Sequence, residues 1–322
     1  ASLPPLARSS MLRANFLPPR FSAMSLPTAA AHANAMRGIL YMLLGIVIFS
    51  IMDGLAKEVS DKYPTPMIMW VRNLAQSVFV LGLVMRLRRY RIARSKRPGL
   101  QIGRSVCNLG QAFLFIFALG MVPLADAVAI GMTGPLMLTA MSALILKEQV
   151  GIRRWSAVAV GCIGALIMVR PGLGVVHWAA MLVIAAAFIN VLSQIGTRVV
   201  SEHDDILTTL FYTTVVGLVI TTMIVPFVWV DMPWEAWAMM AAMGLLGGCA
   251  HLATNRAFTD APASILAPMG YAAIPIAAVV GYIWFHQFPD RWTIVGATIV
   301  VGSGLYVIYR ERVRRREREA AG

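Results

Sequence analysis

Residues 37–57 read RGILYMLLGIVIFSIMDGLAK, a run of apolar side chains interrupted by one aspartate and bounded by basic residues. A helix rises about 1.5 Å per residue, so about 20 apolar residues cross the roughly 30 Å hydrocarbon core of a bilayer. Nine more stretches of this kind follow, at 66–85, 100–120, 124–146, 155–170, 178–199, 206–230, 236–255, 262–285 and 292–309. The sequence therefore predicts an all-α membrane protein with ten transmembrane helices.

The composition narrows the class of protein further. The chain is 58% hydrophobic and 13% charged, whereas soluble domains contain about 25% charged residues. Cys107, Cys162 and Cys249 fall inside apolar stretches without metal-ligand spacing, so neither a disulfide framework nor a metal site is expected. No phosphate-binding glycine loop and no nucleophile–base pair stand out. We therefore expect no enzymatic activity and no cofactor.

The positive charge is unevenly distributed. The net charge of +13 is concentrated in the N-terminal tail, in a loop at 86–97 and in the C-terminal tail. Basic clusters beside membrane helices set orientation through the positive-inside rule, so no nucleic-acid partner is expected. With the N-terminus in the cytoplasm, 23 of the 28 Lys and Arg residues fall on the cytoplasmic side and 4 outside. Both termini are therefore predicted to be cytoplasmic.

The two ends of the chain lie outside the predicted helices. Residues 1–35 contain five Pro, three Arg and no acidic residue. We expect a disordered N-terminal extension here, and the sequence leaves open whether it is present in the native protein. Residues 311–322 are predicted to form a basic cytoplasmic tail.

The two halves of the chain resemble each other. Residues 50–60 (SIMDGLAKEVS) align with 191–201 (VLSQIGTRVVS) at an offset of 141, which pairs Lys57 with Arg198. At an offset of 139, Pro123 pairs with Pro262. Each half, 36–172 and 173–310, holds five predicted spans. An odd number reverses the second copy in the membrane, so the pattern predicts two inverted-topology five-helix repeats with a substrate path at their interface.

Asp53 and Arg72 are charged residues within the predicted spans. Charges are costly in lipid and normally face a cavity or a partner. Adjacent antiparallel helices would place the two at similar depth. They form either a gating or proton-linked pair in the substrate path, or a structural ion pair that locks a helical hairpin, and we favour the structural pair. Lys57 and Arg198, at span ends, are expected to extend toward the headgroups.

Polar residues recur at helical spacing in three spans. Asn108 and Gln111 are three apart, Asn190 and Gln194 are four apart, and His251 precedes another polar residue by four. Each pair shares one helix face. These faces either line a polar cavity or make interhelical hydrogen bonds, and the sequence favours neither. His251 is a candidate proton carrier or a structural residue.

Prolines mark candidate helix breaks at matching positions of the two halves. Pro135 lies in the middle of the fourth span, and Pro268 and Pro275 interrupt the ninth. Broken helices at equivalent positions are a sequence pointer to a transport site. Tyr271, between the two prolines of the ninth span, is predicted to line the cavity. Thr133 is its weaker partner on the fourth span.

The chain resembles the drug/metabolite transporter superfamily, in particular its ten-helix EamA family. The resemblance covers nearly all of 36–312. It is carried by RGILYMLLGIVIFSIMDGLAK (37–57), MVPLADAVAIGMTGPLMLTAMSALILKEQVGIRRW (121–155), the Arg170-Pro171-Gly172 end of the fifth span, APASILAPMGYA (261–272) and GSGLYVIYRER (302–312). It implies a basket of ten helices around a central cavity, in the inner cell membrane. It also implies export of amino acids and other metabolites, or import of riboflavin and nucleoside-like compounds.

Together these features predict a secondary-active transporter of a small organic metabolite that works by alternating access. We expect export of an amino acid or a similar polar or amphipathic solute. Import of a vitamin or nucleoside-like compound is the alternative, and a channel or a membrane-embedded enzyme fits the pattern less well. The expected partners are the solute and the bilayer. A coupling proton or cation and a homodimer are left open.

Overall fold

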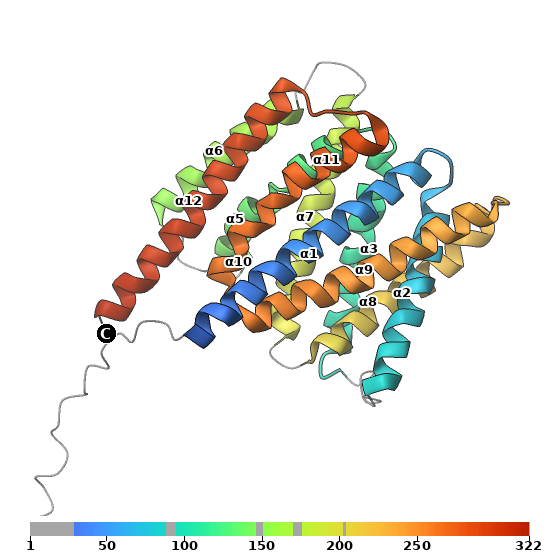
Figure 1. The fold of residues 1–322 in the computed structure, drawn as a ribbon, viewed down its shortest axis with the longest axis horizontal. Helices are drawn as coiled ribbons and strands as arrows, with labels where there is room; N and C mark the ends of the chain where they lie inside the picture. Colours follow the sequence, from blue (N-terminus) through green and yellow to red (C-terminus); the bar gives the residue numbers. More distant parts are fainter. Residues whose placement is uncertain (1–28, 88–94, 146–150, 170–175, 202–203, 322) are drawn as a thin grey trace, which may run out of the picture.

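The computed structural model describes residues 29–87, 95–145, 151–169, 176–201 and 204–321, and they form a helical bundle without strands (Figure 1). The first half comprises α1 (Ala29–Ser60), α2 (Thr65–Leu87), α3 (Pro98–Leu119), α4 (Leu124–Gly131), α5 (Gly134–Ile145) and α6 (Ile152–Val169). The second comprises α7 (Val176–Val200), α8 (Ile206–Ile224), η1 (Val225–Phe227), α9 (Trp234–Asp260), α10 (Ala263–Met269), η2 (Gly270–Ala272), α11 (Ala273–Phe285) and α12 (Arg291–Ala321).

These elements supply ten segments long and apolar enough to cross a membrane. The predicted all-α fold with ten spans is therefore confirmed, and most ends agree within a few residues. The eighth span is longer than predicted, because α9 continues to Asp260 before Pro262 stops it. The first helix begins at Ala29, so 29–35 are helical and do not belong to an extended tail. The remainder of the expected N-terminal extension lies outside the described residues.

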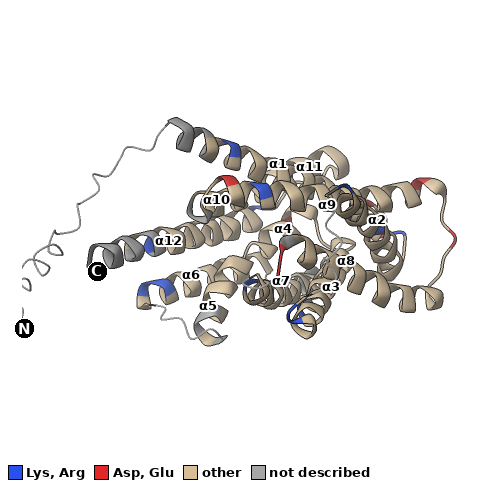
Figure 2. Ribbon diagram, turned by 90° about the horizontal axis from the view of Figure 1, so that it is seen from below, with Lys and Arg blue, Asp and Glu red and all other residues tan. Residues whose placement is uncertain are grey.

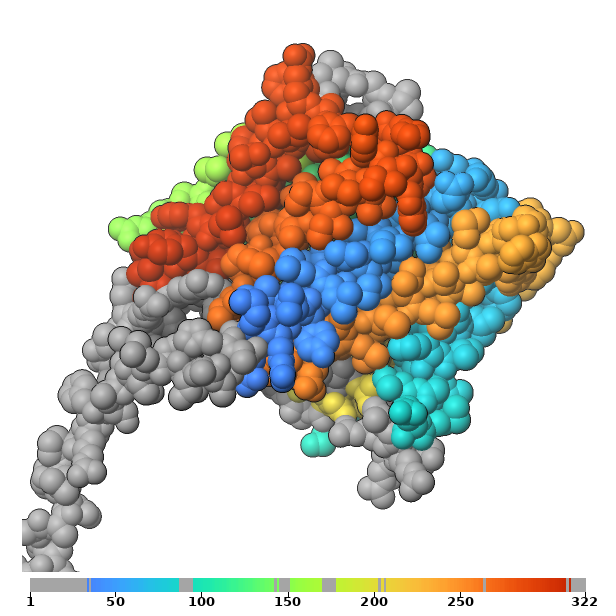
Figure 3. Space-filling model, in the orientation of Figure 1, coloured from blue at the N-terminus to red at the C-terminus, as the bar shows by residue number. Residues whose placement is uncertain are grey.

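The packing of the helices follows the internal repeat. Helix α1 packs on α9 as its counterpart α7 packs on α3, and α2 packs on α9 as α8 packs on α3. Helices α2 and α8 pair with each other, and so do α6 and α12. Figures 1 and 3 show α1 lying between α9 and α11, elements of the other half. The two halves are thus interlocked around a shared centre.

Two spans are interrupted at equivalent positions. The fourth span breaks after Gly131, where α4 ends, and the ninth breaks at Gly270, where η2 begins. The two glycines are 139 residues apart, the same offset that relates the two halves. Pro135 and Pro275 occupy the first turns of α5 and α11, where a missing N–H removes no intrahelical hydrogen bond. The helix breaks therefore lie beside the prolines rather than at them.

The two ends of the bundle are named here by residues of their turns. We call the end with the turns at 61–64 and 120–123 the Ser60 end, and the end with the turn at 200–206 the Asp204 end. At the Ser60 end the apolar side chains of Val59, Met67 and Leu119 are completely buried. Figure 2 shows few charged residues along the described helices. The Ser60 end is closed by apolar packing.

Candidate functional site

Two adjoining cavities of about 440 Å³ each lie inside the bundle. We name them the Asp53 cavity and the Arg104 cavity after residues that line only one of them. Seven residues line both: Phe49, Arg72, Asn108, Ala112, Asn190, His251 and Thr254. Each volume lies within the range of small-molecule sites, about 300–1,000 Å³. Because the two cavities share these residues, they form one continuous path through the bundle.

Both halves of the chain build the cavity walls. The Asp53 cavity is lined by α1, α2, α3, α4, α7, α9, η2 and α11, and the Arg104 cavity adds α8 and Asp204. Within the described part of the chain, α6 and α12 contribute no lining residue to either cavity. The site therefore lies between the repeats, where the inverted-repeat pattern predicted a substrate path.

The cavity walls change in exposure from one end to the other. Ala56, Ile116 and Met243 line the Asp53 cavity near the Ser60 end and are at most 3% exposed. Gln194 and Ser201 line the Arg104 cavity toward the Asp204 end and are exposed. A cavity with a buried floor and an exposed rim is accessible from one end, so the path is open toward Asp204.

Asp53 and Arg72 face the same cavity but do not pair. Both line the Asp53 cavity, and no ion pair within 4.0 Å joins them among the described residues. Arg72 donates to the sulfur of Met69 at 3.7 Å, and its Nε has no hydrogen-bond partner. Helix α1 packs mainly on α9, and α2 on α9 and α8. In this state the two charges attract each other without direct contact, and both the gating pair and the structural pair stay predictions.

Three of the four predicted amide side chains share one cavity with Asp53 and Arg72. Asn108 and Gln111 of α3 and Asn190 of α7 line the Asp53 cavity, and Gln194 lines the Arg104 cavity. In the described structure none of the four makes a side-chain hydrogen bond to another residue. His251 lines both cavities and packs edge-on against Phe49, with 5.2 Å between ring centroids. This arrangement leaves their polar atoms facing the cavity.

Tyr271 and Thr133 lie elsewhere. Tyr271 is 7% exposed, lines neither cavity, and points its hydroxyl at Gly304 of α12. Thr133 is 2% exposed and donates to the carbonyl of Ile130 at 2.8 Å. It therefore satisfies a carbonyl at the helix break instead of reaching the cavity. At the two helix breaks Gly131, Met132 and Gly270 line the Asp53 cavity instead, and cavity roles for Tyr271 and Thr133 stay predictions.

The three prolines are also outside the walls. Pro135 and Pro275 are exposed on the outside of the bundle, and Pro268 is half-buried within α10. None of the three lines a described cavity. Their contribution is to the local course of the two broken helices rather than to contact with a solute.

Arg104 is a lining residue that was not among the predicted site residues, although it lies within the predicted span 100–120. It is 6% exposed and joins three helices at the Arg104 cavity. Its guanidinium donates to Gln101 Oε1 at 2.9 Å, to Thr197 Oγ1 at 3.2 Å and to the carbonyl of Thr209 at 2.6 Å. A signal was present, because Gln101, Arg104, Asn108 and Gln111 recur every three or four residues along one face of α3.

The hydrogen-bond network of Arg104 extends to Asp204, which lies in the turn between α7 and α8. Its carboxylate accepts hydrogen bonds from Gln101 Nε2 at 2.8 Å, from the backbone N–H of Lys96 at 3.1 Å and from the hydroxyl of Ser95. Gln101 thus connects Asp204 to Arg104. The network fixes the Asp204 end of α3 against the start of α8.

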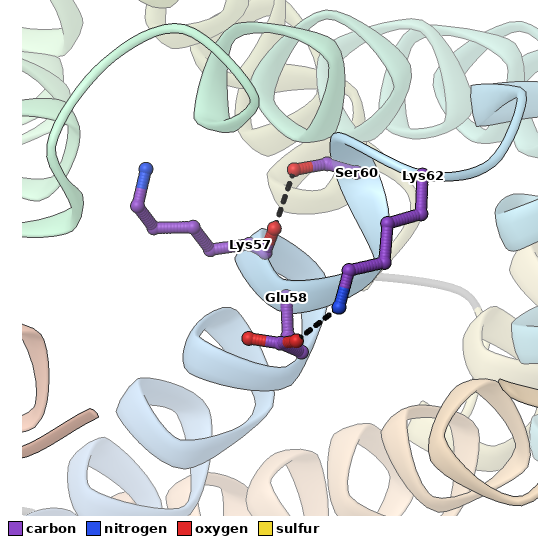
Figure 4. A network of polar contacts seen from close by, with 4 residues as sticks. All are labelled: Lys57, Glu58, Ser60 and Lys62. Atoms are coloured by element: carbon purple, nitrogen blue, oxygen red, sulfur yellow. Dashed lines mark hydrogen bonds and ion pairs between the residues drawn. The ribbon is translucent and has the colours of Figure 1, made fainter. Parts of the chain in front are cut away.

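Lys57 is buried, contrary to the expectation that it reaches the headgroups. It is 6% exposed, and its Nζ donates to the carbonyls of Leu119 and Val122, at 2.9 Å each. The same Nζ lies 5.6 Å from the ring centroid of Phe285. Figure 4 shows its side chain pointing away from Glu58 and Lys62, which pair with each other. Lys57 therefore joins α1 to the end of α3.

Known proteins show the same architecture. A solved crystal structure superposes with a TM-score of 0.62 at 15% sequence identity, covering 85% of this chain and 98% of that one. This likeness shows the fold alone. It agrees with the bundle of two five-span halves described above.

Three characterised relatives are transporters by name, not enzymes. The S-adenosylmethionine uptake transporter of Rickettsia prowazekii is 24% identical over 86% of this chain and 94% of its own. The riboflavin transporter of Vibrio cholerae is 27% identical, over 89% and 98%. The pseudopaline exporter CntI of Pseudomonas aeruginosa is 26% identical, over 82% and 93%. The chain is thus similar to bacterial transporters that are named for different small molecules.

The sequence of each half matches one family. The EamA-like transporter family is found twice, at residues 36–170 and again at 177–310. Together the two matches span most of the chain and meet close to the division between the halves. The ten spans, the repeated packing and the cavity between the repeats agree with this match. The chain therefore belongs to the EamA-like transporter family.

Proposed function

We propose that the chain is a secondary-active carrier that moves a small polar organic solute through the Asp53 and Arg104 cavities by alternating access. One observation carries the proposal: a polar cavity built by both repeats opens toward the Asp204 end and is closed at the Ser60 end. A channel needs a path that is open at both ends. The closed end therefore favours a carrier.

The basic clusters assign the two ends to sides of the membrane. The turns and tails that carry most of the Lys and Arg residues belong to the Asp204 end. By the positive-inside rule this end faces the cytoplasm. The conformation described here is then the inward-open state of the carrier, ready to exchange solute with the cytoplasm.

The unpaired charges define the chemistry of the solute. Arg72 presents a guanidinium with an unused donor, and Asp53 presents a carboxylate, both in the Asp53 cavity. Charges at membrane depth are favourable only when a partner compensates them. A solute with an anionic group at Arg72 and a cationic group at Asp53 supplies both partners. Asn108, Gln111 and Asn190 add donors and acceptors for its remaining polar atoms.

Export is our first candidate for the direction, as the sequence analysis expected, and the exporter among the relatives supports it. Import is the second candidate, because another relative is named an uptake transporter. The same inward-open cavity serves either direction. The driving gradient, and not the shape of the cavity, decides between them.

The proposal is tested by mass spectrometry of spent medium from bacteria that express the chain, its Asp53→Asn variant or an empty vector. Compounds that accumulate only with the active chain identify export, and compounds depleted faster identify import. Asp231→Asn, an exposed aspartate on the loop before α9, is the matched control. Equal profiles for the wild type and Asp53→Asn, at equal protein levels, would contradict the proposed site.

A further inference from the structure

The buried position of Lys57 calls for an explanation because a lysine at a span end normally reaches the headgroups. Its Nζ instead donates to the carbonyl of Leu119, the last residue of α3, and to that of Val122 in the turn that follows. The last carbonyls of a helix lack intrahelical partners and carry the negative end of the helix dipole. They compensate an ammonium well, so Lys57 holds α1 against α3 where the Ser60 end is closed.

The second repeat contains the same parts. Lys57 aligns with Arg198, and the offset of 139 aligns Leu119 with Phe258 and Val122 with Ala261. The two turns share one backbone geometry. Val122 N–H donates to Ala118 O at 3.0 Å, and Ala261 N–H donates to Ala257 O at 2.9 Å. A proline in an extended conformation, Pro123 or Pro262, follows in each case.

The basic residue and the helix end are arranged differently in the two repeats. Lys57 is buried and α1 packs against α3, whereas Arg198 is exposed. The equivalent helices, α7 and α9, do not form one of the packed pairs of the described bundle. The repeat that holds its basic residue against its helix end is the one at the closed end of the path.

We infer that Lys57 and Arg198 are alternating gate residues. In the state described here, Lys57 closes the Ser60 end. When the Asp204 end closes, the Arg198 guanidinium exchanges its present contacts for the carbonyls of Phe258 and Ala261, and Lys57 releases those of Leu119 and Val122. This inference rests on the proposed alternating access, but it assigns the step to two residues outside the solute site.

The test uses thiol labelling in a background without the three native cysteines. Ile116→Cys, at a buried wall position, reports opening of the Ser60 end, and Ser201→Cys, at an exposed one, reports opening of the Asp204 end. A membrane-impermeant reagent is applied to intact cells and to inverted vesicles. Lys57→Met is expected to raise Ile116→Cys labelling roughly tenfold, equivalent to about 1.4 kcal/mol, and to lower Ser201→Cys labelling. Arg198→Met is expected to shift both the opposite way.

Matched controls exist at each end. Lys62→Met removes an exposed lysine whose pKa is raised by its hydrogen bond to Glu58. Arg256→Met removes an exposed arginine that pairs with Asp260 at 3.5 Å. Neither change should alter the labelling pattern. The double variant Lys57→Met with Arg198→Met should restore the wild-type ratio of the two labels, because each end then lacks its gate residue.

A second measurement does not depend on the Lys57 variants. A Ser201→Cys and Ala261→Cys pair, which keeps Arg198 in place one turn before Ser201, should form a disulfide in the closed state of the Asp204 end, and the cross-link should remove the Ser201→Cys label. Failure of the cross-link to form during transport, an unchanged label ratio in Lys57→Met, or shifts of both single variants in one direction would overturn the inference. Labelling does not require a known solute, so the gate proposal and the solute proposal can fail independently.

Discussion

Arg72 combines two properties that are rarely compatible in a membrane protein. Its guanidinium lies at membrane depth, yet its Nε has no hydrogen-bond partner and no carboxylate lies within ion-pair distance among the described residues. A charge in such a place is costly, and the longer-range attraction of Asp53 compensates it only in part. The cavity reduces the cost by admitting water or a solute, so binding of an anionic group stabilises the protein as well as the complex.

We therefore predict that Arg72→Gln lowers solute flux at least about tenfold, because one lost charge-assisted hydrogen bond costs about 1.5–3 kcal/mol. Arg72→Lys should recover only part of the flux, since lysine lacks the planar fork. Flux into or out of cells, normalised to protein level, measures the effect. Arg86→Gln, at the exposed end of the same helix, is the control. Equal losses in both variants would refute a specific role for Arg72.

Tyr271 gives the opposite prediction. Its buried hydroxyl has no hydrogen-bond partner and lies against Gly304, outside both cavities. Removing an unsatisfied buried polar group is neutral or stabilising. Tyr271→Phe should therefore keep full flux and an unchanged or slightly higher melting temperature. A large loss of flux at normal protein level would instead support the cavity role expected from the sequence.

Helices α9 and α2 approach each other closely at Gly244. Gly244 of α9 packs on the α2 backbone beside Arg72; an added Cβ would lie 2.8 Å from Ala75 Cβ and 2.9 Å from Gln76 N. Small residues allow such contacts between membrane helices. The position of Arg72 in the cavity wall therefore depends on a glycine of another helix and of the other repeat.

Gly244→Val should separate α2 from α9 and displace Arg72. Overpacking of this kind costs about 1–3 kcal/mol, so we expect a lower melting temperature together with a large loss of flux. Gly103→Val on α3 is the control, because an added Cβ there meets no atom within 4 Å. Normal flux in Gly244→Val would show that α2 does not need this contact to hold its place.

The sequence predicted the positions of the membrane spans better than the positions of the helix breaks. Ten apolar runs were enough to locate ten helices, because the length of a span is set by the bilayer. The helix breaks were expected at prolines but occur at Gly131 and Gly270. A proline in the first turn of a helix removes no hydrogen bond, so the sequence position of a proline alone did not identify the break.

The candidate site was predictable where polar residues repeat along one helix face. Asn108 and Asn190 were found by this pattern, and the structure places both in the cavity wall. Arg104 belongs to the same pattern, within the predicted span 100–120, but was counted only among the basic residues of the cytoplasmic side. The buried state of Lys57 depends on carbonyls 62 and 65 residues away in the chain. No local pattern contains that contact.

The whole molecule has a pseudo-symmetry that the single state described here breaks. Equivalent helix pairs pack alike near the centre, but one end is closed and the other open. In an inverted repeat, exchange of the conformations of the two halves reverses the side that is open. The asymmetry between the ends therefore reflects one state of the transport cycle and not a permanent difference between the two repeats.

The orientation of the molecule is testable without knowing its solute. The excess of Lys and Arg at the Asp204 end predicts cytoplasmic termini. A fluorescent protein fused after the last residue should fluoresce, and alkaline phosphatase fused there should be inactive, whereas phosphatase fused at the loop around Asp231 should be active. The reverse pattern would place the open cavity on the outer side and invert the assignment of the described state.

Helices α6 and α12 pair with each other and do not line the described cavities. They therefore support the fold, whereas the lining helices form the solute path. Gly164 and Gly296 let their backbones meet closely, so this pair is constrained by its own packing. Changes of cargo can accumulate on the lining helices while the paired last spans of the two halves keep their sequence. A library designed to redirect the protein to a new solute would accordingly vary positions on α1, α2, α3, α7 and α9 and leave α6 and α12 untouched.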